Sequence, residues 1–535
     1  MTKTGKLGLM IGAATIAMMS SAMAQATNAD MAARIQALED RLDAATDRAI
    51  SDRTRLSTIE QQYAYAAWTF DNGRPVLSTG DGRFTMGIRV RFQSDFAGFA
   101  QDDTHGTGFA GPSDLSSGMV VRRAYFGVEG KVYNDFAYEL RLNGGGTNGG
   151  SNGASGGVTG SEGDALVNKA VVTYTGIADW HFSVGVLEPA LMAEGTDSSA
   201  SLMFMERSEI DNIGADSFGA GDSRRGIEIG WSRTDAIWAG DNLAVTGAFT
   251  GGKTGTATNH GSTAATATPP GAADENSQIL GRISDRLWTN GLSNFQIGAS
   301  FAKVLYSGSN GNANGGTQTL NFQDRPQIRV DCTRLVSTGG IADKTGDMMA
   351  FDFEGNLDNF YLGAEWAQFS ADRQCGALAF TGGRCFGGTA TTVADHPTFS
   401  GWFVEGTWII TGETKPYTAS AINNEVGGFG NPVPSRPFSL AGDSWGAWEL
   451  AVRYASTDLN WNTSITGNNL ATSTLAGIAG GKEDIITLGV NWYLNRNVKF
   501  TVNDMIVSVQ KGTLALPTRD SQDLNILGVR MQFAN

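Results

Sequence analysis

Apolar and polar residues alternate with a period of two along much of the chain from residue 83 onward. In residues 83–93, Phe84, Met86, Ile88, Val90 and Phe92 alternate with Thr85, Gly87, Arg89, Arg91 and Gln93. Successive side chains of a β-strand point to opposite faces, so one face of this segment is apolar and the other polar. The pattern predicts strands that separate an apolar environment from water.

Sixteen segments carry features of this kind and are separated by turn-forming residues. They cover residues 83–99, 119–132, 134–146, 165–176, 179–188, 223–234, 241–251, 277–289, 293–306, 348–356, 358–371, 398–410, 446–459, 482–494, 497–510 and 522–533. The links between them alternate between short ones, such as 495–496, and long ones rich in Gly, Ser, Thr and Asn, such as 307–347. A soluble β-sandwich would show the same side-chain alternation, but it has no reason to sort its links by length. An even strand number with short inner turns and long outer loops is typical of an outer-membrane barrel.

The composition agrees with an all-β transmembrane barrel of sixteen antiparallel strands. Only 17% of the residues are charged, whereas about 25% is usual for soluble domains. After the first 25 residues, the sequence has no apolar run near the roughly 20 residues that a membrane-spanning helix needs. Aromatic residues near strand ends predict the girdles at the two membrane interfaces: Trp180, Trp231, Trp238, Trp288, Trp461, Trp492 and Tyr493. The net charge of −15 excludes a broadly basic nucleic-acid binder.

The first 24 residues resemble a secretory signal peptide. Lys3 and Lys6 precede an apolar stretch, and the small residues of the Ala22–Ala24 segment predict cleavage before Gln25. The alternative is a membrane anchor helix, but the apolar stretch is short for that role. We therefore expect residues 1–24 to be removed on export, residues 25–65 to lie in the periplasm and residues 80–535 to form the barrel.

Residues 31–59 show a heptad repeat of apolar side chains. One core position is taken by Ile35, Leu42, Ala49 and Leu56, and the other by Met31, Leu38, Ala45, Asp52 and Ile59. A single helix cannot bury such a seam, so the repeat predicts an oligomeric coiled coil. The alternative is a single amphipathic helix that lies on the barrel.

One link does not follow the alternation of short and long connections. Residues 411–445 are long, although their position in the strand order places them on the periplasmic side. Either a strand pair has been missed there or this inner turn has a role of its own.

Several motifs resemble those of the phosphate-selective porin O and P family. They are Arg122-Arg123-Ala124-Tyr125-Phe126-Gly127, Gly185-Val186-Leu187-Glu188-Pro189, Phe204-Met205-Glu206-Arg207-Ser208 and Gly446-Ala447-Trp448-Glu449-Leu450. The resemblance covers about residues 80–535. It implies a trimeric porin of sixteen strands, with the third and fifth outer loops and one long inner turn folded into the lumen.

Basic residues on the water-facing side of the first four strands are candidates for guiding anions. They are Arg89, Arg91, Arg123, Lys131, Arg141 and Lys169, and Arg207 and Arg224 follow from the third outer loop and its end. Arginine and lysine rings give anion selectivity. The alternative is that these cations are solvated lumen residues paired with Asp95, Glu129, Asp135 and Glu139.

The third outer loop, residues 188–223, is acidic instead. Its candidate constriction residues are Glu188, Glu194, Glu206, Glu209 and Asp211. An acidic loop that faces a basic wall creates the transverse field of a general diffusion porin. We therefore expect weakly anion-selective or nearly unselective conduction.

The sequence predicts a water-filled outer-membrane channel for passive diffusion of small solutes, including phosphate or other anions, and no enzyme. Its predicted partners are a homotrimer, outer-membrane lipid and small anions or polar solutes, without nucleic acid. The alternative is a structural protein that tethers the envelope through the coiled coil, with peptidoglycan as its partner.

No cofactor or metal site is expected, since the four histidines are isolated from one another and from the cysteines. Cys375 and Cys385 are the favoured disulfide pair, with Cys332 as a rival partner.

Overall fold

The computed structural model describes residues 4–64, 67–71, 73–101, 115–145, 167–253, 276–306, 319–331, 333–375, 380–381, 384–385, 393–419, 427–466 and 475–535. The chain divides into two compact units: residues 1–67 with 78–82, and residues 68–77 with 83–535. Cys332 and the side chains of Cys375 and Cys385 lie outside the described part, so the disulfide stays a prediction.

The first unit consists mainly of one helix, α1 (Thr4–Ala64). The apolar residues of its heptad repeat are exposed: Ile35 by 53%, Leu38 by 62% and Leu42 by 66%. Within the described residues of the first unit, the seam is thus uncovered along this helix. None of the described helices combines the length and the apolar character needed to cross a lipid bilayer.

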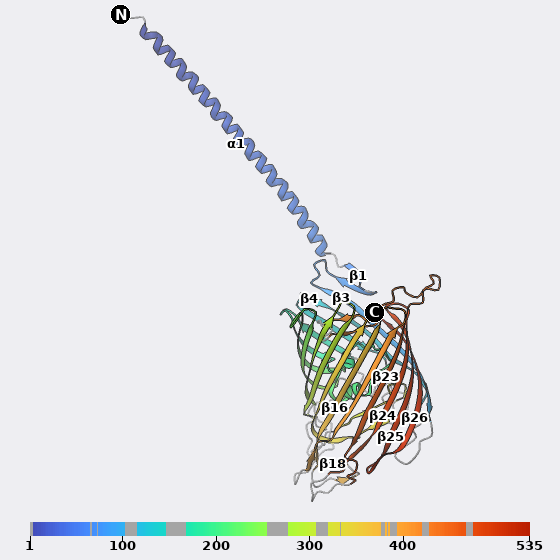
Figure 1. The fold of residues 1–535 in the computed structure, drawn as a ribbon. Coiled ribbons are helices and arrows are strands. Elements are labelled where there is room, and N and C mark those ends of the chain that lie inside the picture. The colour runs from blue at the N-terminus through green and yellow to red at the C-terminus, as the bar shows by residue number, and fades with distance from the viewer. Residues whose placement is uncertain are drawn as a thin grey trace. The chain divides into compact units, whose positions relative to one another are not determined.

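The second unit is a closed antiparallel barrel of sixteen long strands (Figure 1). Its wall consists of β3 (Thr85–Gln101), β4 (Gly118–Val132), β5 (Phe136–Asn143), β6 (Val167–Tyr174), β7 (Trp180–Leu187), β8 (Arg224–Thr234), β9 (Asn242–Lys253), β10 (Ser277–Thr289), β11 (Asn294–Tyr306), β15 (Ile341–Leu357), β16 (Phe360–Cys375), β20 (Thr398–Ile409), β23 (Ala447–Trp461), β24 (Ile478–Tyr493), β25 (Val498–Thr513) and β26 (Leu516–Ala534). The last strand pairs with the first, from Leu524 opposite Gln101 to Ala534 opposite Arg91. The predicted fold class is confirmed.

Most strand boundaries lie within a few residues of the predicted ones, and two strands are longer. Strand β15 begins seven residues before the predicted residue 348, and β26 begins six residues before residue 522. Both additions lie at the end of the barrel that carries the long links, which we call the loop end. The pairing of β25 with β26 continues there as far as Thr513 and Leu516, joined by a tight turn.

Short elements occupy the links and the segment before the barrel. A hairpin of β1 (Ala67–Asp71) and β2 (Arg74–Ser78) precedes the wall, and β2 pairs with β3. The link between β7 and β8 contains α2 (Ala193–Thr196) and α3 (Glu209–Phe218). The other short strands are β12 (Thr319–Leu320), β13 (Gln323–Asp324), β14 (Val336–Ser337), β17 (Phe380–Thr381), β18 (Arg384–Cys385), β19 (Val393–Asp395), β21 (Tyr417–Thr418) and β22 (Gly428–Phe429).

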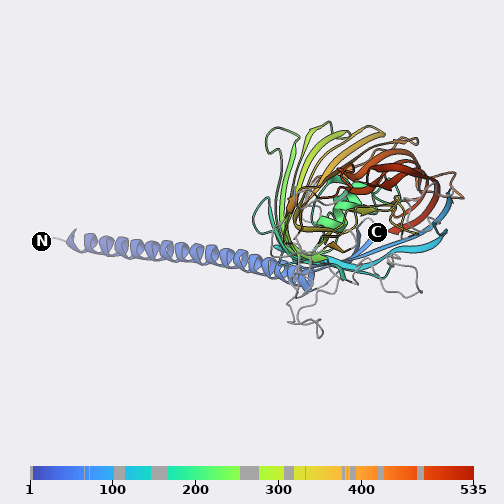
Figure 2. The same cartoon turned by 90° about the horizontal axis from the view of Figure 1, so that it is seen from below.

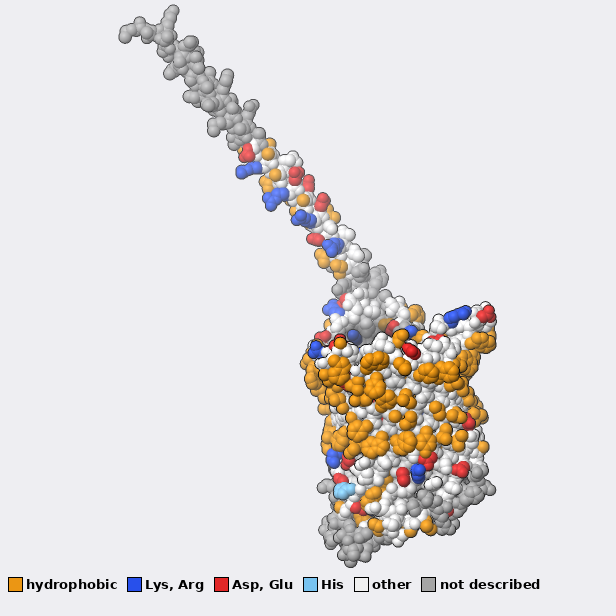
Figure 3. All heavy atoms as spheres, in the orientation of Figure 1, with side chains coloured by type: hydrophobic (Ala, Val, Ile, Leu, Met, Phe, Trp, Pro, Cys, Tyr) orange, Lys and Arg blue, Asp and Glu red, His pale blue; other side chains and the backbone are white. Residues whose placement is uncertain are grey.

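The outer face of the barrel is apolar. Figure 3 shows a broad band of hydrophobic side chains on the visible face, with charged residues above and below it. Residues such as Phe126, Val184 and Phe351 are more than half exposed there. A band of this kind suits lipid, which would cover these side chains in a membrane.

Aromatic residues near strand ends form part of the expected girdles, with two differences from the prediction. Trp180, Trp238 and Trp288 are 40–48% exposed. Tyr493, in contrast, is buried and donates a hydrogen bond to Glu449 Oε2 at 2.6 Å, because its position in β24 turns it into the lumen. Trp461 is half-buried and packs against the core. Both residues were wrongly assigned to the girdles.

The lumen is filled on one side by the segments between β7 and β8 and between β11 and β15. Figure 2 looks along the barrel and shows the green helical segment inside the ring of strands. Phe218 of α3 lies 6.2 Å from Phe322 and 6.3 Å from Phe369 between ring centroids, and Phe322 lies 5.5 Å from Phe399. These rings are buried, so an apolar core anchors both loop segments to the inner wall.

The long inner turn between β20 and β23 also enters the lumen, and its described residues add no strand to the wall. Lys415 forms a buried ion pair with Glu449 at 3.1 Å. The Tyr417 hydroxyl lies 2.7 Å from Gln296 Oε1, and Asn431 Nδ2 donates to the carbonyl of Ala200 at 2.8 Å. The second half of the turn stays outside, where Leu440 is 88% exposed. Of the two explanations for its length, the described residues therefore support an inner turn with a role of its own, and not a missed pair of strands.

Candidate constriction of the pore

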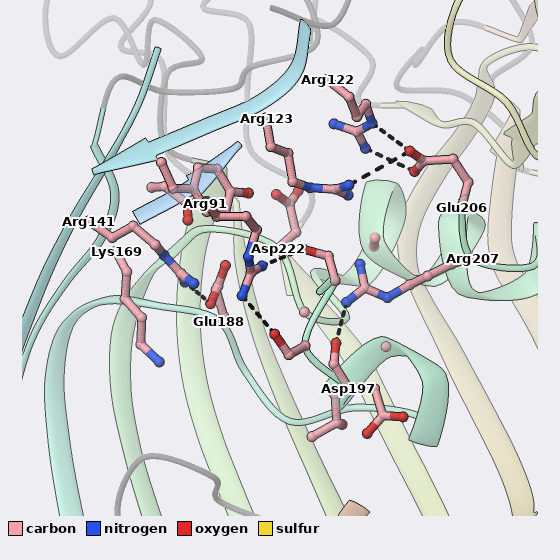
Figure 4. A pocket seen from close by; sticks show the side chains of 18 of the residues that line it. Arg91, Arg122, Arg123, Arg141, Lys169, Glu188, Asp197, Glu206, Arg207 and Asp222 are labelled. Carbon is pink, nitrogen blue, oxygen red and sulfur yellow. Dashed lines mark hydrogen bonds and ion pairs between the residues drawn. The ribbon is translucent and has the colours of Figure 1, made fainter. Parts of the chain in front are cut away.

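A polar cavity of about 170 Å³ lies between the inner faces of β3–β6 and the loop of residues 188–223, which we call the constriction loop. Figure 4 shows that side chains from the strands and from the loop converge on it. The lining includes Arg89, Arg91, Arg122, Arg123, Tyr125, Glu139, Arg141, Lys169, Glu188, Asp197, Ser198, Ser199, Glu206, Arg207, Asp216, Asp222 and Arg329.

Most of the predicted cations meet in this cavity. Arg89, Arg91, Arg123, Arg141 and Lys169 line it from the strands, as the period-two pattern predicts, and Arg207 lines it from the loop. Two do not contribute to the lining. Lys131 is exposed near the end of β4, and the buried Arg224 donates to the carbonyls of Ala215 and Asp216 at 3.1 Å.

The centre of the wall contains a pair of stacked contacts around Tyr125. The guanidinium carbon of Arg91 lies 5.4 Å from the ring centroid of Tyr125, and that of Arg141 lies 5.1 Å from it. Arg91 also donates to the hydroxyls of Ser199 at 2.6 Å and Ser198 at 2.7 Å, both from the constriction loop. These contacts hold the cations in fixed positions on the cavity surface.

A β-bulge adds a cation that the period-two pattern misses. In the pairing of β3 with β4, Gln93 lies opposite Arg123 and Ser94 opposite Val121, so the register skips Arg122. The bulge turns the side chains of both Arg122 and Arg123 inward, since the extra residue breaks the alternation. Two adjacent arginines in a strand are the sequence signal that could have revealed it.

Glu206 of the constriction loop forms ion pairs with several arginines. Its carboxylate is 2.7 Å from Arg122 Nε, 2.6 Å from Arg530 Nη2 and 3.6 Å from Arg329 Nε. Burial alone would raise the pKa of Glu206, but the arginine charges overcome this effect and hold the pKa well below its usual value. Arg530, on the last strand, had no assigned role in the sequence.

The other predicted constriction acids divide into two groups. Glu188 lines the cavity and contacts Arg141. The remaining three are buried and do not line the cavity. Glu194 contacts Arg453, Glu209 accepts from Gln327 Nε2 at 3.1 Å, and Asp211 accepts from Ser208 Oγ at 3.0 Å. The acidity of the loop therefore faces the cavity only in part.

The charge on the cavity surface is mixed with a cationic excess. Eight Arg and Lys side chains line it against six Asp and Glu side chains. Burial raises the pKa of Asp197 to about 7, so this carboxyl carries only part of a negative charge at neutral pH. The strand side of the cavity is cationic, and an anion that enters it meets charge-assisted donors.

Comparisons with known proteins agree with this architecture. The profile of the phosphate-selective porin O and P family matches residues 86–534. An uncharacterized protein of Caulobacter vibrioides is 30% identical over 163 residues, which are 29% of this chain and 28% of that protein. The chain thus aligns with less than a third of the length of this relative.

Solved structures of outer-membrane proteins are similar at low identity. The channel DcaP of Acinetobacter baumannii is 10% identical, with 84% of this chain and 97% of that chain covered and a TM-score of 0.42. The anion-selective porin from Comamonas acidovorans is 11% identical, with 84% and 100% covered and a TM-score of 0.40. OmpF of Salmonella typhi in complex with daunomycin is 11% identical, with 87% and 100% covered and a TM-score of 0.41.

The family match spans nearly the whole barrel, and the barrel has the apolar outer band and polar lumen side of a membrane pore. The protein lies in the outer membrane and is a channel. The chain belongs to the phosphate-selective porin O and P family.

Proposed function

We propose that this channel passes small anions by passive diffusion, with a weak preference for anions over cations. The observation that carries the proposal is the cavity, which eight cationic side chains line against six acidic ones. A cationic constriction raises the local concentration of anions and lowers that of cations. Phosphate is one of these anions, since arginine donors match its oxygens in pairs.

The preference is weak because acids share the surface. Glu188 and Glu206 each contact arginines of the wall, which cancels part of the positive charge. A phosphate ion also loses hydration on entering the cavity, and the arginines must replace it. We therefore expect chloride and phosphate to compete without strong discrimination.

Reversal potentials across planar bilayers test this proposal. In a potassium chloride gradient, the wild-type channel is expected to prefer chloride, and added phosphate to reduce the chloride current. The R91Q/R123Q variant should lower the chloride-to-potassium permeability ratio by roughly twofold or more, because two charges leave the cavity. The matched control is K303Q, since Lys303 is 39% exposed and ion-paired with Asp347 away from the cavity lining. Strong cation preference in the wild type, with no effect of phosphate, would overturn the proposal.

We also propose that α1 associates with α1 of other copies of this chain, as a coiled coil. The support is its uncovered apolar seam, in which Ile35, Leu38 and Leu42 are each more than half exposed. Heptad seams of this kind are buried by other helices. We propose three copies, the number that the resemblance to a family of trimeric porins implies. Contact of this segment with peptidoglycan stays a prediction.

A further inference from the structure

We propose that Arg74, in the hairpin before the barrel, is a specificity-determining residue at the periplasmic end of the cationic wall. By cationic wall we mean the basic residues that line the cavity from β3–β6: Arg89, Arg91, Arg122, Arg123, Arg141 and Lys169. Arg74 neutralises Glu129, so that the charge of Arg89 remains available to passing anions. The inference rests on the proposed anion passage. It concerns a residue that precedes the family match, which begins at residue 86.

The cationic wall ends in a row of two acids. Glu129 of β4 and Glu139 of β5 lie directly opposite each other in the strand register, and both side chains are buried. Adjacent like charges on paired strands repel each other. They would also present a negative band to an anion that leaves the cavity toward the periplasm, unless cations neutralise both.

Each of the two acids has its own cations. Glu139 lies 3.4 Å from Lys169 Nζ and 3.7 Å from Arg141 Nε. Glu129 lies 2.8 Å from Arg89 Nε, and it also contacts Arg74 Nη1. Arg89 lines the cavity, whereas Arg74 and Glu129 lie beyond its lining. Two arginines therefore share the carboxylate of Glu129, so the group of Arg74, Arg89 and Glu129 carries a net charge of +1, whereas Glu129 and Arg89 alone would be neutral.

The backbone brings the Arg74 guanidinium to this place. Gly73 turns the hairpin with a φ of +85°, and an added Cβ there would come within 2.9 Å of Asn497 Oδ1. Gly87 of β3 is the register partner of Glu129, and a Cβ at Gly87 would lie 3.4 Å from Arg74 Nε. The absence of a side chain at Gly87 thus leaves room for the guanidinium beside Glu129.

Asp71 also contacts Arg74, at 3.3 Å from Nη2, but its side chain is 57% exposed. Solvent and salt screen an exposed charge far more than a buried one. The Glu129 side chain is 7% exposed, so its contact with Arg74 governs the field inside the lumen.

Single substitutions on the two sides of this contact should shift selectivity in opposite directions. R74Q leaves Glu129 with Arg89 as its described ion-pair partner, and the chloride-to-potassium permeability ratio should fall by roughly two- to threefold, as expected for one charge at about 7 Å in water. E129Q removes the buried acid that both arginines contact and should raise the ratio. The double variant R74Q/E129Q should return the permeability ratio close to the wild-type value. R74K keeps the positive charge, so its permeability ratio should stay near that of the wild type.

The control variant is R233Q, since Arg233 is 58% exposed and its contact with Asp179 spans 4.0 Å at another turn. The heat-induced mobility shift of the barrel, measured on gels, reports folding of every variant. If Arg74 only held the hairpin in place, R74Q and E129Q would lower stability to the same extent. They would then not shift the permeability ratio in opposite directions. If R74Q fails to assemble, E129Q alone must still raise the ratio.

Two outcomes separate this inference from the proposed function. An unchanged ratio in both R74Q and E129Q, together with a reduced ratio in R91Q/R123Q, overturns the role of Arg74 and leaves anion passage intact. An unchanged ratio in all of these variants overturns both.

Discussion

Single residues of this channel act mostly through shared contacts. Glu206 belongs to the constriction loop, yet its partners come from β4, β26 and the segment between β11 and β15. Three arginines cannot pack side by side without an anion between them, because their mutual repulsion in a buried site is large. Glu206 therefore supplies the counter-charge that fixes both the loop and the arginines.

Replacing Glu206 with Gln should loosen the loop and strengthen anion preference together. The substitution keeps the shape and removes the charge, and breaking one side of a buried ion pair costs roughly 3–5 kcal/mol. Hydrogen exchange of the amides of residues 202–212 should become faster, and the chloride-to-potassium permeability ratio should rise. E228Q is the control, because Glu228 is buried on the inner wall opposite His181, at 3.7 Å. Wild-type exchange rates in E206Q would contradict this account.

Among the elements, α3 carries the docking of the constriction loop. Ile210, Ile213 and Phe218 are buried in the apolar core of the lumen, whereas Glu209 and Asp211 place carboxyls in the same interface. Apolar burial supports docking, and the carboxyls oppose it whenever they are ionised. The helix thus combines a stable anchor with titratable groups.

The stability of this docking should depend on pH. Burial raises the pKa of Glu209 to about 7 and that of Asp324, which faces α3, to about 8. In an undocked loop these carboxyls would ionise near their ordinary values of 4.5 and 3.8. Their contribution to docking is therefore complete below about pH 4 and is lost as the pH rises through 7 and 8.

Hydrogen exchange of α3 in the intact channel measures this effect. Exchange should be faster at pH 9 than at pH 6, after correction for the intrinsic dependence of exchange on pH. The E209Q/D324N variant should show a weaker dependence. Glu206 acts in the opposite sense, since its lowered pKa removes stability only in acid. Equal protection of α3 at both values would disprove the pH dependence.

At the scale of the whole molecule, the chain joins a barrel to a helix with an uncovered seam. The barrel satisfies its own backbone hydrogen bonds by pairing β26 with β3. Within the described residues of its own unit, the helix does not bury its apolar residues, and Met31 and Leu56 are also more than half exposed. Assembly of several copies would bury the apolar seam of this helix.

Polar residues in the seam should weaken this assembly without closing the pore. In L38N/L42N, two core layers lose their apolar contacts, so chemical crosslinking of α1 between copies should fall several-fold. Single-channel conductance should stay at the wild-type value. R48Q changes a flanking residue and serves as the control. Unchanged crosslinking would favour the other interpretation, a helix that packs on its own barrel.

Envelope tethering is tested separately. Residues 28–62 are deleted and envelope detachment is measured.

The sequence determined the strands, their number and their faces, because apolar and polar residues alternate along each strand and turn-forming residues separate the strands. It correctly placed Arg89, Arg91 and Arg141 on the inner wall, and it identified the family. Local patterns could not place side chains that depend on irregular backbone. The inward Arg122 at the β-bulge is of this kind, whereas the inward Tyr493 follows the regular alternation of β24 and was open to prediction.

Only the tertiary structure decided which charges meet. Arg530 and Glu206 lie 324 residues apart in the chain, and Arg74 and Glu129 lie 55 apart. Their contacts depend on closure of the barrel, on the hairpin and on the path of the constriction loop. The net charge of the chain does not reveal these contacts between charged side chains. The electrostatic field inside a pore depends on a few distances between charges and on their burial. The sequence specified a channel, and the fold decided which of its charges an ion encounters.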